Sequence, residues 1–539
     1  MAQTEFDALT RTDPETLLDP LTLELVFDPP LDQAEVVKRV ATALRDAGAA
    51  VSAAFDSQDD RFFFVDFADI DPKGQEAEVF AFARAMGVAA QAQEVNPVLT
   101  DSLYGAAATG AAVDTESFLS LCETPRNSTL AFGWHHPRID TPSAWAHTRG
   151  QGSVVAVIDT GYSSHFELRD VIQQQGQRNF VEGGTDAQDR FSGGMMTHPG
   201  HGTLVMSVIA SRGTAAQTGE TGTPGAVTGT APAAKVLPIR AIRSVIDFTQ
   251  RRVGSAIMHA VDQNADVISM ALGGPSRVAA TEQALRNAVA NGTVIVCAAG
   301  NCWPWVVFPA AYAEFGLCTA IAALQPDLRP WDKSGQGPAV SFSVFGEHVW
   351  GAAKNAATDP DAGIRASQGT TLATSMTAGV AALWVAHHGG RTALLAHAQD
   401  IGTTVQAMWV HCATSGMTRP AEWGGSTKLG AGVLNAARTL ATPLPQGDEA
   451  LQTPTETVET TGNILLTHMA NNHPEAVDDV TEDMIEFAPE LLWLSYRAGA
   501  KQRALSTGTE TRITPDQPSA DLSAAIVGKP ALRALFGAM

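Results

Sequence analysis

The chain contains the stretch GTTLATSMTAGVAAL at Gly369–Leu383, in which a glycine turn carrying hydroxyl groups runs into an unbroken apolar helix of small residues. A helix N-terminus offers backbone N–H groups without intrahelical acceptors and the positive end of the helix dipole. It therefore favours negative charge that develops beside it. The sequence predicts that this helix presents a nucleophilic hydroxyl, for which Thr371 and Ser375 are the two candidates.

The length and composition predict a soluble, multidomain protein. With 539 residues the chain exceeds a single ordinary core, so roughly two or three domains are expected. Apolar residues make up 45% of the chain and charged residues 17%, as in globular proteins. The formal net charge of −22 argues against nucleic acid or a membrane surface as a partner, although solubility alone would explain it equally well.

The N-terminus and the cysteines bear on the cellular location. Residues Met1–Asp7 lack a basic segment followed by an apolar one, so no secretory signal is expected. No apolar run reaches the about 20 residues that span a bilayer. The five cysteines are few, odd in number and irregularly spaced, which favours free thiols over a disulfide framework. Together these observations predict a cytoplasmic protein.

The N-terminal part of the chain predicts a small α+β domain. Residues 1–20 are polar and acidic, and we expect them to form a leader. In residues 21–97, strand-like and helix-like patterns follow one another in the order β-α-β-β-α-β, which describes a ferredoxin-like unit. Residues 98–139 are rich in small and hydroxyl residues without a clear period, so they are expected to form a linker.

Residues 140–441 alternate buried strands with amphipathic helices. Four of the strands are the apolar runs Val154–Ile158, Val236–Ile239, Val267–Met270 and Val294–Ala298. Such strands, separated by helices, predict an α/β domain with a doubly wound, mostly parallel sheet and helices on both faces. Residues 442–462 are predicted to be a second linker, and residues 463–539 a helical C-terminal extension with a disordered segment at 507–519.

Polar residues in this α/β region stand where a strand ends or a helix begins. Asp159 ends the first strand, His201 opens an apolar helix, and Asn301 follows another strand. Because ligands bind at the carboxyl edge of an open α/β sheet, we expect these groups to meet the hydroxyl of the opening stretch there. Together they supply an orienting carboxylate, a general base, an oxyanion donor and a nucleophile, the set that acyl transfer requires.

Each of these residues also has a purely structural interpretation. Asp159 could cap the following turn, Asn301 could be an ordinary loop residue, and Thr371 could be an N-cap. The H-x-x-H spacing that ends at His201 could indicate zinc, but a Pro-Gly pair interrupts it, so no metal site is predicted. The order and context of the four groups favour the catalytic interpretation.

These segments resemble ordered motifs of the subtilisin-like serine peptidases (subtilases). The motifs are Asp159-Thr160-Gly161, Gly200-His201-Gly202-Thr203, Ser269–Gly274, Ala298–Asn301, Phe308-Pro309-Ala310 and Gly430–Ala436. The resemblance covers residues 140–441 and implies a subtilisin-like fold and hydrolysis of a peptide or protein substrate. The ferredoxin-like unit resembles subtilase propeptides, which are intramolecular inhibitors and folding chaperones. Calcium is common in the family, but no loop here has a defensible ligand spacing, so no cofactor is expected.

The nucleophile position of the family falls on Thr371. The family motif reads Gly-Thr-Ser-Met-Ala-x-Pro and continues to Ala-Gly. Alignment through Ala378-Gly379 puts Thr371 at its serine and Ser375 at its proline. The other register would move the nucleophile about 6 Å along the helix axis, beyond the about 3 Å reach of a general base. Thr371 is therefore the predicted nucleophile, and Ser375 is the alternative.

Two functions follow from the resemblance. The first is an intracellular endopeptidase in which Thr371 attacks and His201 takes its proton. Asp159 would orient the imidazole, and Asn301 with the Thr371 N–H would stabilise the oxyanion. The second is a pseudopeptidase that binds a peptide or protein partner without turnover, because the threonine methyl crowds the site.

The strand Ser269–Gly274 is expected to pair with an extended substrate and, with Ala298–Gly300, to wall a pocket for an apolar P1 side chain. The residues predicted to bind substrate are Ser269, Leu272, Gly273, Gly274, Ala298, Ala299 and Gly300.

Overall fold

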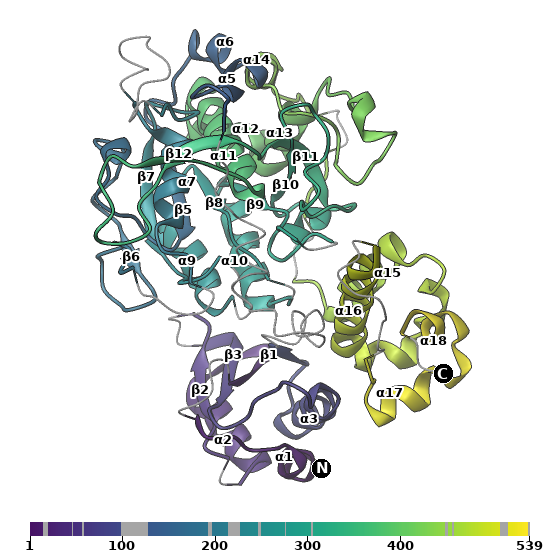
Figure 1. The fold of residues 1–539 in the computed structure, drawn as a ribbon. Helices are drawn as coiled ribbons and strands as arrows, with labels where there is room; N and C mark the ends of the chain where they lie inside the picture. Colours follow the sequence, from purple (N-terminus) through teal and green to yellow (C-terminus); the bar gives the residue numbers. More distant parts are fainter. Residues whose placement is uncertain are drawn as a thin grey trace.

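The computed structural model of the protein describes most of the chain (Figure 1). The described residues are 1–14, 20–45, 47–55, 59–98, 128–191, 197–213, 227–245, 250–274, 276–302, 305–447, 451–454, 458–506 and 516–536. Most of the predicted linker between the first two domains, residues 99–127, lies outside them, as does most of the segment predicted to be disordered, residues 507–515.

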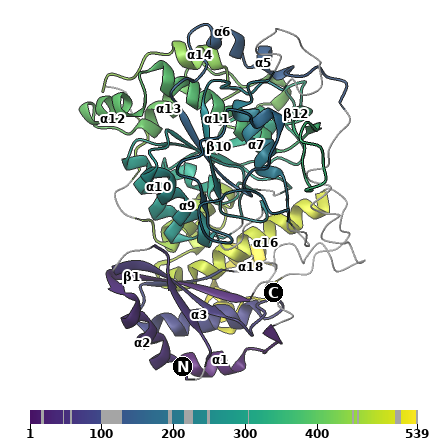
Figure 2. The same cartoon turned by 90° about the vertical axis from the view of Figure 1, so that its left-hand side faces the viewer.

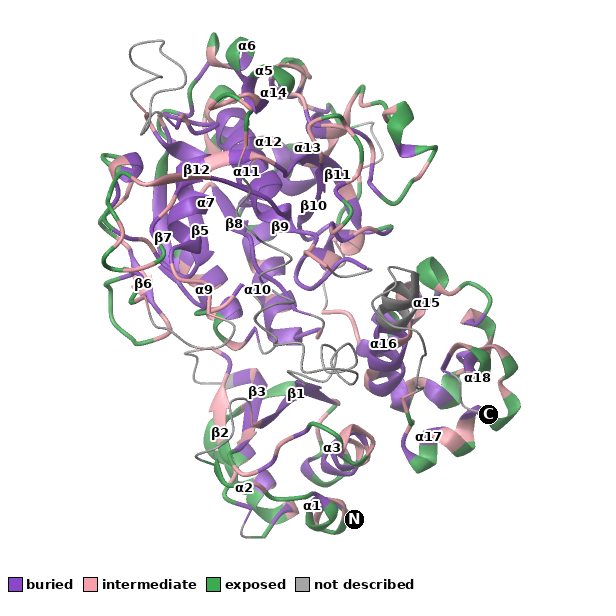
Figure 3. Ribbon diagram, viewed as in Figure 1, coloured by how far each residue is buried: buried purple, intermediate pink, exposed green. Residues whose placement is uncertain are grey.

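The largest unit contains a seven-stranded sheet with the strand order β11-β10-β9-β8-β5-β7-β6. All neighbouring strands pair in parallel. The strands are β5 (Val154–Asp159), β6 (Arg178–Asn179), β7 (Lys235–Arg240), β8 (Val267–Met270), β9 (Val294–Ala298), β10 (Thr319–Leu324) and β11 (Val340–Phe345). Nearly all of their apolar side chains are buried, and Figure 3 draws most of the strands in purple, the colour of buried residues.

Helices cover both faces of this sheet. α7 (His201–Ala210) follows β6 in the chain and packs against β5. α9 (Arg251–Asp262) and α10 (Ala279–Ala290) form a second pair, in which α9 contacts β5 and α10 contacts β9. α11 (Thr370–His387) packs against α7 and the central strands. The predicted doubly wound α/β fold is therefore confirmed.

Further elements complete this unit. They are α5 (His135–Arg138), α6 (Thr141–Trp145), β12 (Val349–Ala352), β13 (Ile364–Ser367), α12 (Arg391–Asp400), α13 (Val405–Thr414) and α14 (Ala436–Ala441), with short 3₁₀ turns at Phe166–Leu168, Ala310–Phe315 and Ala421–Trp423. β12 and β13 form an antiparallel pair. The Ala352 N–H donates to Ser207 Oγ of α7 at 2.9 Å. α7 is thus held between the sheet and this hairpin.

The N-terminal unit is a four-stranded antiparallel sheet with the order β2-β3-β1-β4, packed on two helices. Its elements are β1 (Leu21–Asp32), α2 (Gln33–Ala43), β2 (Ala50–Ala53), β3 (Asp59–Phe67), α3 (Glu76–Ala90) and β4 (Glu94–Val98). This order and topology are those of the predicted ferredoxin-like domain, which is confirmed as part of the fold.

The first residues of the chain differ from the prediction of a leader. Residues Ala2–Ala8 form α1, and Phe6 is buried with its ring centroid 5.5 Å from that of Phe67 and 5.4 Å from that of Phe82. Phe6 and Leu9 lie three residues apart, so they share one face of the helix. Two apolar anchors in a polar stretch were too few to reveal this helix from the sequence.

The N-terminal sheet docks on the starts of α9 and α10. Glu24 of β1 is fully buried, and its carboxylate accepts hydrogen bonds from the backbone N–H groups of Ala279 and Ala280 at 3.0 and 2.9 Å. A carboxylate in this position satisfies N–H groups that the helix itself cannot pair and complements its dipole. Arg251, the first residue of α9, forms an ion pair with Asp66 of β3 at 2.8 Å.

A helical extension follows the α/β unit and contacts both other parts of the molecule. Its helices are α15 (Thr461–Asn472), α16 (Ala488–Ser506), α17 (Ala520–Ala525) and α18 (Pro530–Phe536). Figure 2 shows α16 running between the N-terminal domain and the α/β unit. Trp493 of α16 packs on Phe80 of α3 with ring centroids 5.5 Å apart, and Tyr496 stacks on Trp305 with centroids 4.9 Å apart.

A buried arginine joins the three parts of the molecule. The side chain of Arg277 is only 3% exposed and lies 3.2 Å from Glu94 in the N-terminal domain. It also lies 3.3 Å from Glu282 in α10 and donates a hydrogen bond to the Thr461 hydroxyl of the extension at 2.8 Å. Burial of this charge is therefore compensated by groups from all three parts.

The cysteines agree only in part with the prediction of free thiols. Cys297, Cys318 and Cys412 are free and buried, but Cys302 is disulfide-bonded. The prediction is thus wrong at Cys302, because irregular cysteine spacing gave no sign of a disulfide. Within the described part of the chain, none of the helices is both long and apolar enough to cross a membrane.

Candidate active site

The predicted catalytic residues Asp159 and His201 meet at the carboxyl edge of the seven-stranded sheet. Asp159 is the last residue of β5, and His201 is the first residue of α7. His201 Nδ1 lies 2.9 Å from Oδ1 and 3.0 Å from Oδ2 of Asp159, and both residues are buried. Since a carboxylate only accepts, Nδ1–H donates to it and the ring is fixed with Nε2 turned away from Asp159.

Thr371 lies on the other side of the imidazole. Its Oγ1 is 3.3 Å from His201 Nε2. Thr371 is the second residue of α11, so its backbone N–H has no intrahelical acceptor. The helix starts after Gly369, whose φ of +138° suits glycine, and a Cβ there would lie 2.9 Å from Asn301 Nδ2. The hydroxyl is thus held at the positive end of a helix, within reach of a base.

Asn301 lies beside the same helix start. Its Oδ1 accepts hydrogen bonds from the Thr370 N–H at 2.8 Å and from the Thr370 hydroxyl at 2.7 Å. These two bonds orient the amide, with Oδ1 toward Thr370 and Nδ2 over Gly369. An amide donor held in this way can stabilise negative charge on an oxygen next to Thr371.

The alternative nucleophile Ser375 is not part of this group. It lies one turn further along α11 with no exposed surface, and its Oγ donates a hydrogen bond to the Thr371 carbonyl oxygen at 2.8 Å. Its hydroxyl is therefore used inside the helix. The structure brings together Asp159, His201, Thr371 and Asn301, and it leaves Ser375 out.

Most of the residues predicted to bind substrate have buried side chains. Ser269 pairs with Val157 of β5 and Val296 of β9, so its side chain lies inside the sheet rather than at a surface. β8 has to run to Met270 before the chain leaves the sheet, which explains this position. The side chains of Leu272, Ala298 and Ala299 are also buried, and Gly300 is partly exposed.

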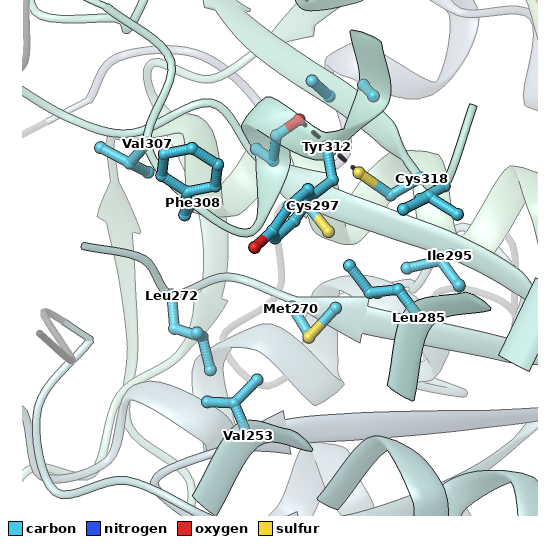
Figure 4. Close-up of a cluster of buried hydrophobic side chains, with 14 of the residues drawn as sticks. Val253, Met270, Leu272, Leu285, Ile295, Cys297, Val307, Phe308, Tyr312 and Cys318 are labelled. Carbon is cyan, nitrogen blue, oxygen red and sulfur yellow. Dashed lines mark hydrogen bonds between the residues drawn. The ribbon is translucent and has the colours of Figure 1, made fainter. Parts of the chain in front are cut away.

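The backbone of Gly273 and Gly274 is already paired within the chain. The Gly273 N–H donates to Val245 O at 2.9 Å, and Gly274 exchanges two 2.9 Å backbone hydrogen bonds with Phe308. Val307 packs so closely on Gly273 that a Cβ there would lie 2.4 Å from Val307 Cγ2. Figure 4 shows Val307 and Phe308 at the edge of a buried apolar cluster. A substrate strand that used the Gly273 N–H would therefore have to displace Val245.

The described residues hold no candidate metal centre near these groups. Clusters of three or more His, Cys, Asp or Glu side chains that could bind a metal are absent from the described ranges. His198 lies near His201, with ring centroids 6.5 Å apart, but the nitrogens of His201 face Asp159 and Thr371. A zinc ion shared by the two histidines does not fit this arrangement.

Sequence reasoning missed one buried carboxylate beside the site. Asp189 lies in the loop before α7, and its Oδ2 accepts a hydrogen bond from the Gly200 N–H at 2.7 Å, directly before His201. The residue follows no recognisable motif, and single acidic residues in polar loops are too common to predict a role. Only the folded chain reveals that it contacts the site.

The α/β unit of the chain is similar to known proteins. The model of the subtilase family (Peptidase_S8) matches residues 150–435. Thermitase of Thermoactinomyces vulgaris is 33% identical over 266 residues, which cover 48% of this chain and 85% of thermitase. The major intracellular serine protease of Bacillus subtilis (strain 168) is 36% identical over 166 residues, which cover 30% of this chain and 47% of that protein. The solved structure of a protease from Pseudoalteromonas arctica gives a TM-score of 0.46 at 26% identity, over 59% of this chain and 99% of that one.

Proposed function

Since the chain belongs to the subtilase family of serine-type peptidases, we propose that it is an endopeptidase in which Thr371 takes the place of the serine nucleophile. One observation carries the proposal. His201 lies 2.9 Å from the Asp159 carboxylate through Nδ1 and 3.3 Å from the Thr371 hydroxyl through Nε2. This is the order of contacts that a nucleophile, a base and an orienting carboxylate require.

In the proposed reaction, His201 Nε2 accepts the proton of the Thr371 hydroxyl while Oγ1 attacks the substrate carbonyl carbon. Asp159 stabilises the imidazolium, and Asn301 Nδ2 with the Thr371 N–H donates to the oxyanion. The intermediate then collapses, the C–N bond breaks, and His201 returns its proton to the leaving amine. A water molecule, deprotonated by His201, hydrolyses the ester on Thr371 and frees the enzyme.

The threonine methyl group lowers the expected rate. It restricts χ1 and occupies space next to the position that the substrate carbonyl must reach. Thr371 is itself only 3% exposed. A misplacement of about 1 Å costs about a hundredfold in rate. Slow turnover on a restricted set of substrates is therefore the expected behaviour.

A fluorophosphonate acylation-site probe tests the proposal on the full chain. Labelling of the wild-type protein at Thr371, located by mass spectrometry, is expected and should be abolished by Thr371→Ala and by His201→Ala. Thr371→Ser should label and cleave faster because the methyl group is gone. Ser375→Ala is the matched control, since it removes a neighbouring hydroxyl that points into the helix. Labelling that moved to Ser375 would refute the assignment.

The second candidate is a pseudopeptidase that binds a peptide or protein partner without turnover. The methyl group of Thr371 favours it, because it restricts χ1 and crowds the position that a reacting carbonyl must reach. If wild-type protein neither labels nor cleaves any peptide of a diverse library while Thr371→Ser does both, the pseudopeptidase is the correct function.

An apolar P1 preference stays a prediction, which a cleavage profile dominated by Lys or Arg would contradict.

The N-terminal domain is proposed to be an intramolecular inhibitor and folding chaperone. Its docking through Glu24 on the start of α10 and through Asp66 on Arg251 supports this role. Mapping of new N-termini by mass spectrometry after incubation should locate a cut between the domain and residue 140. A chain that stays intact while it cleaves peptides would show instead that the domain is a permanent accessory part.

A cytoplasmic location also stays a proposal. The relative in Bacillus subtilis is named an intracellular protease, which supports it. The disulfide at Cys302 argues the other way, because reducing compartments keep most thiols free. Localisation of a tagged full-length chain by cell fractionation decides between the two.

A further inference from the structure

Asp159 and His201 belong to different elements, so the end of β5 and the start of α7 have to be held at a fixed separation. Thr160 follows Asp159, and Gly200 precedes His201. One oxygen atom contacts both of these neighbours: Asp189 Oδ2 accepts from the Thr160 hydroxyl at 3.1 Å and from the Gly200 N–H at 2.7 Å. A single carboxylate oxygen thus ties together the residues that flank the candidate acid–base pair.

Thr160 extends this tie to the other side of His201. Its Oγ1 accepts a hydrogen bond from the Gly202 N–H at 3.1 Å, while its own N–H donates to Asp159 Oδ1 at 2.7 Å. His201 is therefore flanked on both sides by backbone N–H groups bonded to the Asp189–Thr160 pair. The same pair is bonded to the carboxylate that orients the imidazole.

Asp189 is itself held rigidly. Its side chain is 3% exposed, its Oδ1 accepts from the Phe191 N–H at 2.9 Å, and its backbone N–H donates to Tyr162 O at 2.8 Å. Arg240 Nη1 lies 3.8 Å from Oδ1 and also donates to the Thr160 carbonyl oxygen. A buried carboxylate whose two oxygens are engaged resists displacement, because any movement would leave a buried charge or N–H unpaired.

We infer that Asp189 is a positioning residue, which fixes the imidazole of His201 between Asp159 and the Thr371 hydroxyl. The inference rests on the proposed endopeptidase function for its catalytic consequence. The His201–Thr371 separation of 3.3 Å lies beyond the usual length of such a bond, so a small rotation of the imidazole would break the contact. Asp189 acts only through Thr160 and the residues beside His201, and it touches no substrate.

The test compares two variants of the full chain that each remove one hydrogen-bonded carboxylate. Asp189→Asn keeps the size of the side chain but replaces one oxygen with an NH₂ group. In one orientation this group faces the Phe191 N–H, and in the other it faces the Thr160 hydroxyl and the Gly200 N–H, so two donors oppose each other in both. Asp266→Asn is the matched control. Asp266 accepts a hydrogen bond from the Val154 N–H at 2.8 Å, at the opposite end of β5 from Asp159. Both variants should lose stability, but only Asp189→Asn should disturb His201.

Two measurements report on His201. The first is the far-downfield proton resonance of an imidazole Nδ1–H bonded to a carboxylate, which does not depend on whether Thr371 is reactive. It should persist in Asp266→Asn and vanish or broaden in Asp189→Asn. The second is the rate of fluorophosphonate labelling at Thr371, which should fall at least about tenfold in Asp189→Asn only. An unchanged resonance and rate in Asp189→Asn, or equal losses in both variants, would overturn the inference.

The two measurements also separate the inference from the proposed function. If the wild-type protein is not labelled at Thr371, the endopeptidase proposal fails, while the resonance still decides whether Asp189 positions His201. If Asp189→Asn does not fold, Thr160→Val replaces it, because valine keeps the shape and removes the bonds to Asp189 and Gly202. Loss of the resonance in Thr160→Val then supports the inference that Asp189 positions His201 through Thr160, and persistence of the resonance overturns it.

Discussion

Glu24→Gln tests whether the N-terminal domain is held in place through the start of α10. In the wild-type chain, the two carboxylate oxygens of Glu24 accept from the N–H groups of Ala279 and Ala280 at 3.0 and 2.9 Å, and Asn96 donates to the same group at 3.3 Å. The carbonyl oxygen of the glutamine can accept from one of these N–H groups, but its NH₂ group then faces the other N–H group, which is also a donor. The substitution removes both the charge and one acceptor.

The magnitude follows from these contacts. A hydrogen bond to a charged group contributes about 1.5–3 kcal/mol, and a buried N–H left unpaired costs about 1–3 kcal/mol. Burial raises the pKa of the Glu24 carboxyl, so lost hydration of the charge offsets part of the gain. We therefore expect a net loss of about 2–4 kcal/mol, which is about 30- to 700-fold in the opening equilibrium.

Hydrogen exchange of the amides at Ala279 and Ala280, followed by mass spectrometry, measures this opening directly. Asp32→Asn is the matched control. The Asp32 side chain caps α2 inside the N-terminal domain and accepts from the Glu35 N–H at 2.9 Å, so it should leave exchange at α10 unchanged. Equal exchange at Ala279 and Ala280 in Glu24→Gln and wild type would refute the argument that this carboxylate fastens the domain.

Three further predictions concern other parts of the chain. Burial raises the pKa of Glu167 from 4.5 to about 7. The stabilisation by Glu167 is thus fully present below pH 4.5 and is lost as the pH rises through about 7. The loss in the free energy of unfolding is about 3 kcal/mol, measured by urea unfolding. In Glu167→Gln this pH-dependent loss should be absent. Arg84→Met breaks the 2.8 Å pair with Glu490, whose side chain is only 1% exposed, and should cost about 3–5 kcal/mol. Urea unfolding should show part of that stability restored in the double variant Arg84→Met/Glu490→Gln, and no restoration would contradict the pairing. Ser375→Ala should cost about 1 kcal/mol in thermal unfolding, because one hydrogen bond to Thr371 O is lost, with labelling at Thr371 retained.

The sequence predicted that the four groups of the candidate site lie together, because each stands at the end of a strongly patterned element. Asp159 ends an all-apolar strand, and His201 opens an apolar helix, so topology alone places them at one edge of the sheet. The choice of Thr371 over Ser375 depended on the register of Ala378-Gly379. The structure explains why that register is fixed: a Cβ on Gly379 would lie 2.5 Å from Thr230 Cβ, so only glycine fits there.

The parts that the sequence could not predict depend on contacts between distant segments. Asp189 matters because of where its oxygens lie relative to Thr160 and Gly200, and no periodicity encodes that position. Glu24 interrupts the apolar pattern of its strand, and its hydrogen-bond partners are backbone N–H groups of another domain. Ser269 was expected in the substrate site because it starts a recognisable motif, whereas the sheet extends past it.

The site around Arg277 has a consequence for the way the protein is made. Arg277, Glu94 and Glu282 leave the ribosome well before Thr461, which supplies the remaining hydroxyl partner. The N-terminal domain can therefore dock on α10 during synthesis, but its enclosure is completed only by a segment that is translated after the α/β unit. A premature stop between Ala441 and Thr461 would leave all the predicted catalytic residues in place and a buried charge only partly compensated. A segment that follows the α/β unit thereby determines how firmly the N-terminal domain is held.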